Sequence, residues 1–494
     1  MNAFAKNYRH IYTKQKKIAQ ISMAYLLCTI GTSLAAEPPE AQTKQISEAT
    51  ETRAVRVPYL AESVRNTIKD ELRNEIVAQA AREHWGEPGA LPEWIGRIKW
   101  GGDLRIRYQK NIFSKSNAPY ENVLATNAGG GYTMQNTTEN YQLYRLRARI
   151  GMQAKLSDAA RIETRIASGS PSNPISTNQT MGNSFNRYGL ALDLAAIKLE
   201  PWTWWQFGVG RTGNPWFGTD LVWASDLGFE GAFSKLSPNL IDGWPRPFVT
   251  VGAFPLEKQD CANAAQNTMC ANDKWLYGAQ MGLESPVSHR IGIKFGVGYY
   301  DYKKIAGAMN SLQDNANKGM TPKFVQRGNT VFNLDPTGAT RLLGLAADYT
   351  ELNMTGSLDI ALLDPTHLVL IGDYVNNVGY DRNAITQRTS GQVDVPPRTK
   401  GYLAKLIVGK QEMRKGGDWQ VSGTYKYLQR DAVVDAYTDS DLHLGGTDTK
   451  GWVLGLNYGI TTDTWMTVRW LTADQIDGPP LAIDVVQIDL GAKF

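Results

Sequence analysis

The last residues of the chain alternate strictly between apolar and polar side chains. Within residues 483–494 one parity is apolar: Val486, Ile488, Leu490, Ala492 and Phe494. Because successive side chains of a β-strand point to opposite faces, this segment predicts a strand with one apolar and one mostly polar face. A strand of this kind that ends on an aromatic residue is typical of a membrane barrel, with lipid on one side and a wet lumen on the other.

The same period of two recurs along the chain from residue 98 onward. In the second predicted strand, Arg145, Arg147 and Arg149 share one parity. A charge on the lipid face costs about 2–4 kcal/mol at the membrane midplane, so this parity must face the lumen. We predict sixteen strands, at residues 98–112, 139–155, 160–169, 187–199, 203–213, 229–237, 246–256, 274–285, 290–304, 346–363, 367–379, 399–411, 418–430, 450–461, 464–474 and 483–494.

The connections between these strands are alternately short and long. An outer-membrane barrel has short periplasmic turns and long external loops, and an even strand number lets the first and last strands pair antiparallel. The predicted fold is therefore all-β, a transmembrane antiparallel β-barrel over 98–494 with both termini in the periplasm. The long connections are 113–138, 170–186, 214–228, 257–273, 305–345, 380–398 and 431–449.

The residues before the barrel predict two further segments. Residues 1–35 combine a basic start, an apolar run and a small-residue site, which is the pattern of a signal peptide. The run is shorter than the ~20 residues of a spanning helix, which argues against a membrane anchor. Residues 36–97 predict a polar tether followed by a periplasmic helix at 58–85. That helix could oligomerise, or it could pack against the barrel or a partner.

Composition narrows the class of protein. Charged residues are 20% of the 494 residues, which is unlike a helical membrane protein, and 47 Gly with 14 Trp, 22 Tyr and 13 Phe fit many turns and aromatic girdles. The net charge is +4, but residues 1–35 alone carry +5 and leave −1 for the remainder. We therefore expect no nucleic-acid partner.

Removal of the signal peptide leaves two cysteines, Cys261 and Cys270, in one long connection. An even number of cysteines in an exported protein predicts a disulfide bond. A metal site would need further ligands, and no His lies nearby, so we expect no metal and no cofactor.

A basic strip is the main candidate for function. Seven arginines fall on lumen-facing parities of the first three strands, together with the acids Asp103 and Glu163: Arg105, Arg107, Arg145, Arg147, Arg149, Arg161 and Arg165. One interpretation is a strip that biases the permeation of charged solutes. The alternative is a solvated wall braced by ion pairs.

The connection 213–228 is rich in aromatic residues and too apolar to lie in water. We expect it to fold into the barrel as a constriction loop, carrying Trp216, Asp220, Trp223 and Asp226. Acids facing the basic strip would then create a transverse field across a narrowed pore. The alternative is a loop packed at a subunit interface or over the barrel mouth.

Catalysis has little support in this sequence. Of the four histidines after residue 35, only His443 lies near acids, Asp439 and Asp441, and in a loop we expect that cluster to be solvated. There is no phosphate-binding loop, and we predict no catalytic residue and no enzyme activity.

Three segments resemble the "putative porin" family of Gram-negative outer membranes, which is distantly related to phosphate-selective porins. They are LVWASDLGFEG at 221–231, DAYTDSDLHLGGTDTKGW at 435–452 and the terminal GAKF. The resemblance implies a passive channel that is often trimeric, in a family whose members mostly have no assigned substrate. Lys405 and Lys426 form no lysine ladder, so phosphate specificity is not implied.

We therefore expect a porin of the outer membrane that lets small hydrophilic solutes or ions diffuse through a water-filled channel. Its partners would be outer-membrane lipid, the permeating solutes and further copies of the chain in a homotrimer. The alternative is a structural or adhesive barrel with a plugged lumen and functional external loops, for which the long connection 305–345 is the best support.

Overall fold

The computed structural model describes residues 71–72, 75–76, 96–241, 244–258, 273–288, 290–313, 317–363 and 365–494. The chain divides into two compact units, Met1–Arg82 and Glu83–Phe494. In the first unit Glu71, Leu72, Glu75 and Ile76 are helical and exposed, within the helix predicted at 58–85. The rest of that helix, the predicted signal peptide at 1–35 and the predicted Cys261–Cys270 disulfide lie outside the described residues.

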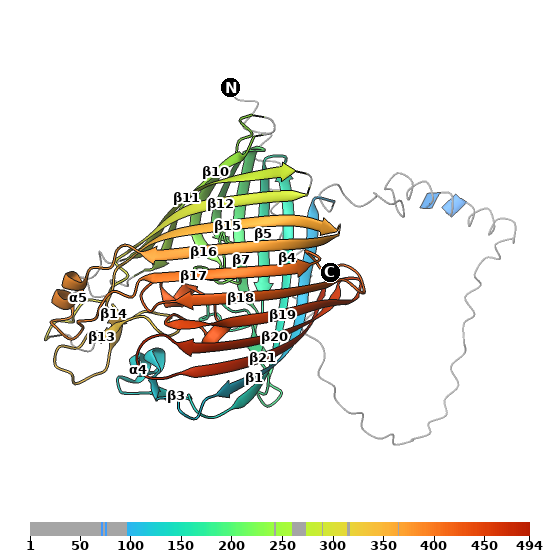
Figure 1. Ribbon diagram of the computed structural model, residues 1–494. Helices are drawn as coiled ribbons and strands as arrows, with labels where there is room; N and C mark the ends of the chain where they lie inside the picture. The colour runs from blue at the N-terminus through green and yellow to red at the C-terminus, as the bar shows by residue number, and fades with distance from the viewer. Residues whose placement is uncertain are drawn as a thin grey trace, which may run out of the picture. The chain divides into compact units, whose positions relative to one another are not determined.

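The second unit is a closed antiparallel β-barrel of 16 strands (Figure 1). This confirms the fold class and the number of strands predicted from the alternation of side chains. The barrel strands are β1 (Ile98–Phe113), β4 (Tyr141–Ser157), β5 (Ala160–Ala167), β7 (Ala191–Trp202), β8 (Trp205–Thr212), β9 (Phe229–Leu236), β10 (Arg246–Glu257), β11 (Lys274–Ser288), β12 (Ile291–Lys303), β15 (Tyr349–Leu363), β16 (Thr366–Asn377), β17 (Lys400–Gly409), β18 (Trp419–Leu428), β19 (Thr449–Thr461), β20 (Thr464–Gln475) and β21 (Ala482–Lys493).

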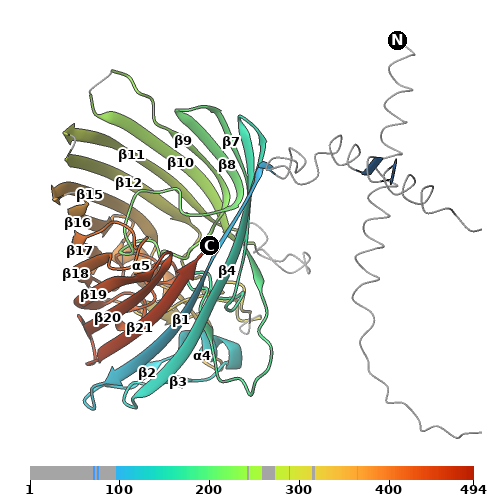
Figure 2. The same ribbon diagram turned by 90° about the vertical axis from the view of Figure 1, so that its right-hand side faces the viewer.

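The ring closes where the last strand, β21, pairs with the first, β1, which in turn pairs with β4 (Figure 2). The register places Ile106 opposite Leu490, so the apolar faces of the two strands are continuous, as the alternation predicts. Phe494 and Gly102 exchange two backbone hydrogen bonds of 3.0 and 3.1 Å. A Cβ atom at Gly102 would lie 2.6 Å from the Phe494 ring, so only glycine allows the terminal aromatic residue to cover this strand.

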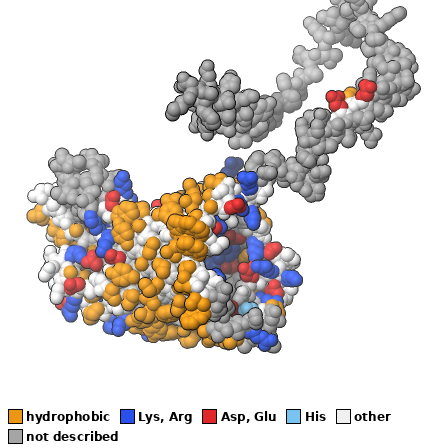
Figure 3. Space-filling view, turned by 90° about the horizontal axis from the view of Figure 1, so that it is seen from above, with side chains coloured by type: hydrophobic (Ala, Val, Ile, Leu, Met, Phe, Trp, Pro, Cys, Tyr) orange, Lys and Arg blue, Asp and Glu red, His pale blue; other side chains and the backbone are white. Residues whose placement is uncertain are grey.

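The outer face of the barrel is an apolar band between two charged ends (Figure 3). Leu370 and Leu490, for example, are 42% and 52% exposed on this face. Aromatic residues gather toward its borders, such as Trp202 and Trp204, whose stacked ring centroids are 5.4 Å apart. A band of this composition matches the hydrocarbon layer with its interfacial aromatic girdles.

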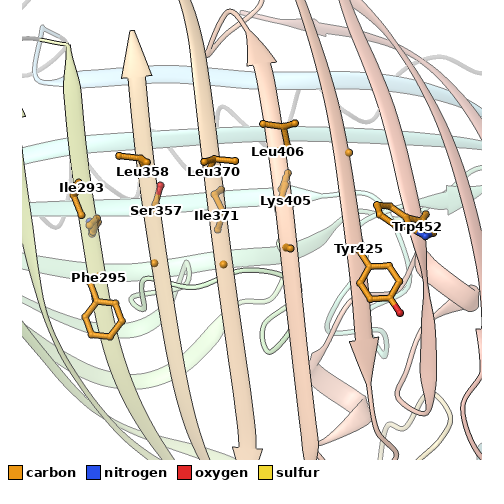
Figure 4. Close-up of a pocket in the computed structure, with 15 residues that line it drawn as sticks. Ile293, Phe295, Ser357, Leu358, Leu370, Ile371, Lys405, Leu406, Tyr425 and Trp452 are labelled. Carbon is orange, nitrogen blue, oxygen red and sulfur yellow. The ribbon is translucent and has the colours of Figure 1, made fainter. Parts of the chain in front are cut away.

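A shallow pocket also lies on this apolar face (Figure 4). It arises because Gly356, Gly372 and Ala404 are register neighbours across three strands, next to the larger Phe295. The pocket is therefore a dip in the lipid-facing wall, and it does not belong to the lumen.

Neighbouring positions on β16 allow a direct test of the two faces. We expect Leu370→Arg to destabilise the folded barrel by about 2–4 kcal/mol, because it places a charge in the lipid layer. Ile371→Arg is the control, since Ile371 lies on the opposite, inner face of the same strand. Urea unfolding in lipid vesicles measures both variants, and equal losses would contradict the assignment of faces.

Most small elements lie in the long connections, at the barrel end away from the C-terminus (Figure 1). None of the helices among the described residues is long and apolar enough to cross a membrane. The two-residue strand β6 (Gln179–Thr180) pairs with β4 at the edge of the wall. The other short elements are β2 (Tyr120–Glu121), α4 (Val123–Gly129), β3 (Met134–Gln135), β13 (Val331–Asn333), β14 (Leu343–Leu345), α5 (Arg382–Arg388), η2 (Asp435–Tyr437) and η3 (Leu442–Leu444).

Strand boundaries deviate most from the prediction at β7, which begins at Ala191 rather than at residue 187. The register between β5 and β7 shifts so that Arg165 pairs with Leu194 and Ile166 pairs with Leu192. Asp193 is the extra residue of this bulge, and its buried carboxylate pairs with Arg165. The bulge explains why the alternation in the sequence slips within this strand.

Several long connections build one buried core with the barrel wall, and two of them also bind charged side chains of that wall. We name these two the first inner loop (213–228) and the second inner loop (429–448). Leu221 and Trp223 of the first and Val433 of the second share a buried cluster with Tyr300 and Tyr349 of the wall. Apolar side chains of these loops thus fill part of the barrel interior.

Candidate functional site

The first inner loop is buried among aromatic residues of the wall. Trp216 and Trp223 are 6% and 3% exposed, and both pack edge-on against Tyr300 at centroid distances of 5.2 and 5.0 Å. The aromatic side chains that made this loop unsuited to water are thus buried inside the barrel. The sequence correctly indicated infolding, whereas the role of the loop as a constriction stays a prediction.

Polar contacts fix the first inner loop to the wall opposite its own strands. Thr219 donates two hydrogen bonds to the Asp373 carboxylate, 2.6 Å from Oγ1 and 3.1 Å from the backbone nitrogen. The Gln280 amide pairs with both backbone groups of Phe217, at 2.8 and 2.6 Å. Since Asp373 is on β16 and Gln280 is on β11, the loop leaves β8 and reaches across the lumen.

The two acids of this loop have different surroundings. Asp226 lies 3.2 Å from Arg149 and 3.8 Å from Arg147, and it also accepts a hydrogen bond from the Thr177 hydroxyl. Burial would raise the pKa of Asp226, but the two guanidinium groups and Thr177 lower it overall. Asp226 therefore stays ionised and is joined directly to the basic strip.

Asp220 does not reach the basic strip. Its side chain is exposed, while its backbone carbonyl accepts hydrogen bonds from the Lys426 ammonium and the Thr438 hydroxyl, both at 3.1 Å. Of the two acids that were expected to face the arginines, only Asp226 does so, and it forms ion pairs with them. The geometry thus favours a strip whose positive charge is compensated by acids. The sequence had indicated acids that face the arginines across an open pore, with an electric field between them.

The centre of the basic strip lies where β1 and β4 pair. Arg105 is opposite Arg147, and Arg107 is opposite Arg145. Arg107 is 1% exposed and forms two hydrogen bonds of 2.7 and 2.8 Å with the Asp489 carboxylate of β21. The fold tolerates this cluster of positively charged arginines because carboxylates lie between them.

The other charged residues predicted for the strip lie on β4 and β5 and form ion pairs, with one exception. Arg161 binds Glu200 and Arg165 binds Asp193, each at 2.6 Å. Glu163 pairs with Lys198. The exception is the half-buried Arg145, which has no ion-pair or hydrogen-bond partner among the described residues and whose Nε is shielded from solvent.

The second inner loop contributes an acid that the sequence analysis did not include in the site. Asp441 accepts hydrogen bonds from Arg469 at 2.8 Å, from Arg107 at 3.3 Å and from Gln487 at 3.2 Å. Burial alone would raise the pKa of Asp441, but Arg469 and Arg107 hold it well below its usual range. The loop therefore docks on the strip through a permanently ionised carboxylate.

The expectation of a solvated cluster around His443 is wrong. His443 is 1% exposed, and its Nε2 donates to the Leu481 carbonyl at 2.9 Å. Burial and the charge of Arg327 lower the pKa of His443 to about 3, so the ring is neutral. The buried run at 432–434, read as Ala-Val-Val, was the signal in the sequence that this connection does not stay in water.

The two inner loops hold each other in place. The Thr438 hydroxyl donates to the Leu221 carbonyl at 2.9 Å, and the Ala224 amide donates to the Tyr437 carbonyl at 2.7 Å. Because Asp226 and Asp441 bind different arginines of the strip, the pair of loops is anchored to the wall at two points.

Below these anchors, toward the C-terminal end of the barrel, lies a cavity of about 560 Å³. Five cationic and two anionic side chains line it: Lys99, Arg147, Arg149, Arg165, Lys493, Asp103 and Glu163. Within the described ranges no group of His, Cys, Asp and Glu side chains could hold a metal ion. Cationic side chains thus outnumber acidic ones on the wall of this cavity, and Arg147, Arg149 and Arg165 are paired with Asp103, Asp226 and Asp193.

The sequence of the chain matches a family model described as "Putative porin" over residues 9–494. No protein of a curated collection matches the chain. The family match covers the complete barrel, including both inner loops.

Several solved barrel structures resemble the fold. A high-pH structure of Pseudomonas putida OprB has a TM-score of 0.48 at 12% identity and covers 81% of this chain and 96% of its own. The outer membrane channel DcaP of Acinetobacter baumannii has a TM-score of 0.41 at 11% identity, covering 80% and 97%. The trimer form of OmpT of Vibrio cholerae has a TM-score of 0.40 at 11% identity, covering 80% and 99%.

Proposed function

Because this chain belongs to the putative porin family, we propose that it forms a water-filled channel for passive diffusion of small hydrophilic solutes, with a preference for anions. The family and the barrel support an outer-membrane channel. The preference for anions is the finer part of the proposal, and it depends on the charges at the narrowed level of the lumen.

One observation carries this preference: cations outnumber acids on the wall of the 560 Å³ cavity, five to two. The adjoining narrow level has the same sign of imbalance, with Arg105, Arg107, Arg145, Arg147, Arg149 and Arg469 around Asp103, Asp226, Asp441 and Asp489. Arginine stays charged at any relevant pH. The surplus positive charge lowers the energy of an anion at this level relative to a cation.

Recording from the purified protein in planar bilayers tests the channel. Stepwise conductance with a reversal potential of anion-preferring sign in a potassium chloride gradient is the expected result. The opposing candidate is a plugged structural or adhesive barrel, which the apolar core between the two inner loops favours. Absence of conductance over many insertions would decide for that candidate.

Replacing Arg145, Arg147 and Arg149 together by Ser is expected to abolish most of the anion preference, because three positive charges leave this level of the lumen. The reversal potential in a salt gradient measures this change. Arg414→Ser is the matched control, because Arg414 pairs with Glu412 at a short turn, with its side chain 71% exposed. An unchanged reversal potential in the triple variant would mean that the strip is purely structural.

Trimeric assembly is part of the same proposal, since the family resemblance implies it. The outer apolar band would then face lipid on part of its circumference and neighbouring copies on the rest. Chemical cross-linking in native membranes should yield a trimer band, and an exclusive monomer at saturating cross-linker would contradict it.

A further inference from the structure

A second pocket, of about 440 Å³, lies at the barrel end that carries the long connections. Its walls come from connection 168–190, the first inner loop, the ends of β9 and β10, and the segment 304–348. No arginine of the basic strip lines it. Its volume is within the range of pockets that bind small molecules.

The inner wall of this pocket is aromatic. Phe229 stands edge-on to Trp223 and to Phe254, with ring centroids 5.1 and 5.2 Å apart. All three side chains are buried, between 2% and 4% exposed, so their positions are set by packing. A rigid wall of perpendicular rings offers both faces and edges, which is the arrangement that accommodates another planar ring.

The polar side chains at the mouth favour a negative charge. Both acids are already paired, Glu230 with Arg211 at 2.5 Å and Glu257 with Lys274 at 2.7 Å. In contrast, the Nη2 of Arg211 and the ammonium of Lys323 have no hydrogen-bond or ion-pair partner among the described residues. A carboxylate would satisfy both of these donors.

The pocket shares a wall with the narrowed level of the lumen. Trp223 and Leu227 belong to the first inner loop and line the pocket, while Asp226 between them binds Arg147 and Arg149. A molecule held in the pocket therefore contacts the segment that carries the anchor of this loop.

We propose that this pocket binds a small aromatic carboxylate, with its ring against Phe229 and Phe254 and its carboxylate between Arg211 and Lys323. The site goes beyond the channel function, because it would hold its ligand outside the basic strip. Binding of the ligand there can be measured without recording a current. It would act as a capture site for this class of solute at the end that bears the long connections.

Equilibrium dialysis of the full chain in detergent micelles, with radiolabelled benzoate as the probe, tests the proposal. We expect saturable binding of one benzoate per chain. Acetate lacks the ring and benzyl alcohol lacks the carboxylate, so each should compete at least tenfold more weakly than unlabelled benzoate. If benzyl alcohol competes as well as benzoate, or if no saturable binding occurs, the proposal is overturned.

Two kinds of variant locate the binding. Arg211→Gln with Lys323→Gln removes the free donors, and Ser172→Trp fills the pocket from its exposed rim without changing any charge. Each should weaken benzoate binding at least tenfold, whereas Arg382→Gln, at an exposed pair on α5, should leave it unchanged. Heat-modified electrophoretic mobility verifies that each barrel is folded, and undiminished binding in both variants would place benzoate elsewhere.

The outcome is separable from that of the channel proposal. A barrel that is silent in bilayers but binds benzoate at this pocket would refute the channel and leave the site. A conducting barrel with no benzoate binding would do the reverse.

Discussion

Replacing Asp441 by Asn is expected to increase the anion preference of the channel and to loosen the second inner loop. Asp441 is the only partner of Arg469 among the described residues, and it also binds Arg107. Loss of its charge leaves one more uncompensated positive charge at the narrow level. At an effective dielectric constant of ~20, the interaction of a permeating ion with a unit charge ~4 Å away is up to about 4 kcal/mol before screening. We therefore expect the ratio of anion to cation permeability to change roughly twofold or more.

The same substitution removes an anchor of the loop. Losing one partner of a buried ion pair costs roughly 3–5 kcal/mol, and we expect about the lower figure because Arg107 keeps Asp489 as a partner. Reversal potentials in a salt gradient measure the first effect, and urea unfolding of vesicle-bound protein measures the second. Asp394→Asn is the control, since Asp394 pairs with Arg382 in an exposed connection.

A reversal potential that stays at the wild-type value in Asp441→Asn would mean that permeating ions do not pass this carboxylate. The second inner loop would then be a plug beside the conducting path rather than a part of its wall. Since Asp226 anchors the first inner loop in the same way, comparison with Asp226→Asn would show which loop borders that path.

The barrel could be predicted from the sequence because lipid imposes a simple rule on every strand. A charge facing hydrocarbon is costly, so the parity that carries Arg145, Arg147 and Arg149 had to face inward. The closing pair of strands followed from the same rule and agrees with the observed register. In β7 the alternation of apolar and polar positions shifts by one residue, and the bulge at Asp193 is the local cause.

The interior could be predicted only in part, because its contacts join residues that are far apart in sequence. The infolding of the first inner loop could be predicted from its Trp and Phe content. The contacts of the second could not, because Asp439, Asp441 and His443 are typical of a solvated surface. Only the fold brings Arg107, 334 positions away, beside Asp441. The partners of the strip were missed for the same reason, and with them the extent to which its charge is compensated.

Asp435 should contribute to the pH dependence of the second inner loop. Burial, together with the nearby Asp431, raises the pKa of Asp435 from 3.8 to about 7, against opposing hydrogen bonds from backbone amides. In the folded loop this carboxyl holds a proton that the opened loop releases. The stabilisation is therefore complete below about pH 4 and is lost as the pH rises toward 7. A shift of this size corresponds to about 4 kcal/mol as an upper bound.

Replacing Asp435 by Asn removes this titration while keeping the shape of the side chain. Amide hydrogen exchange of residues 429–448, corrected for intrinsic rates, should show that the wild-type loop opens more readily at about pH 8 than at about pH 5. The variant should lose part of that difference and be the more protected at the higher pH. Burial also raises the pKa of Asp431, and it raises the pKa values of Asp439 and Asp448 to about 6, so these acids act in the same direction and leave a residual dependence.

The direction of the effect separates this explanation from an ordinary acid-driven opening. The ion pair with Arg469 holds the pKa of Asp441 well below its usual range, so acidification to about pH 5 leaves this anchor of the loop intact. Equal or greater protection of the wild-type loop at about pH 8 than at about pH 5 would overturn the role given to Asp435. Asp394→Asn, exposed and outside the loop, should reproduce the wild-type profile and excludes a general effect of removing a carboxylate.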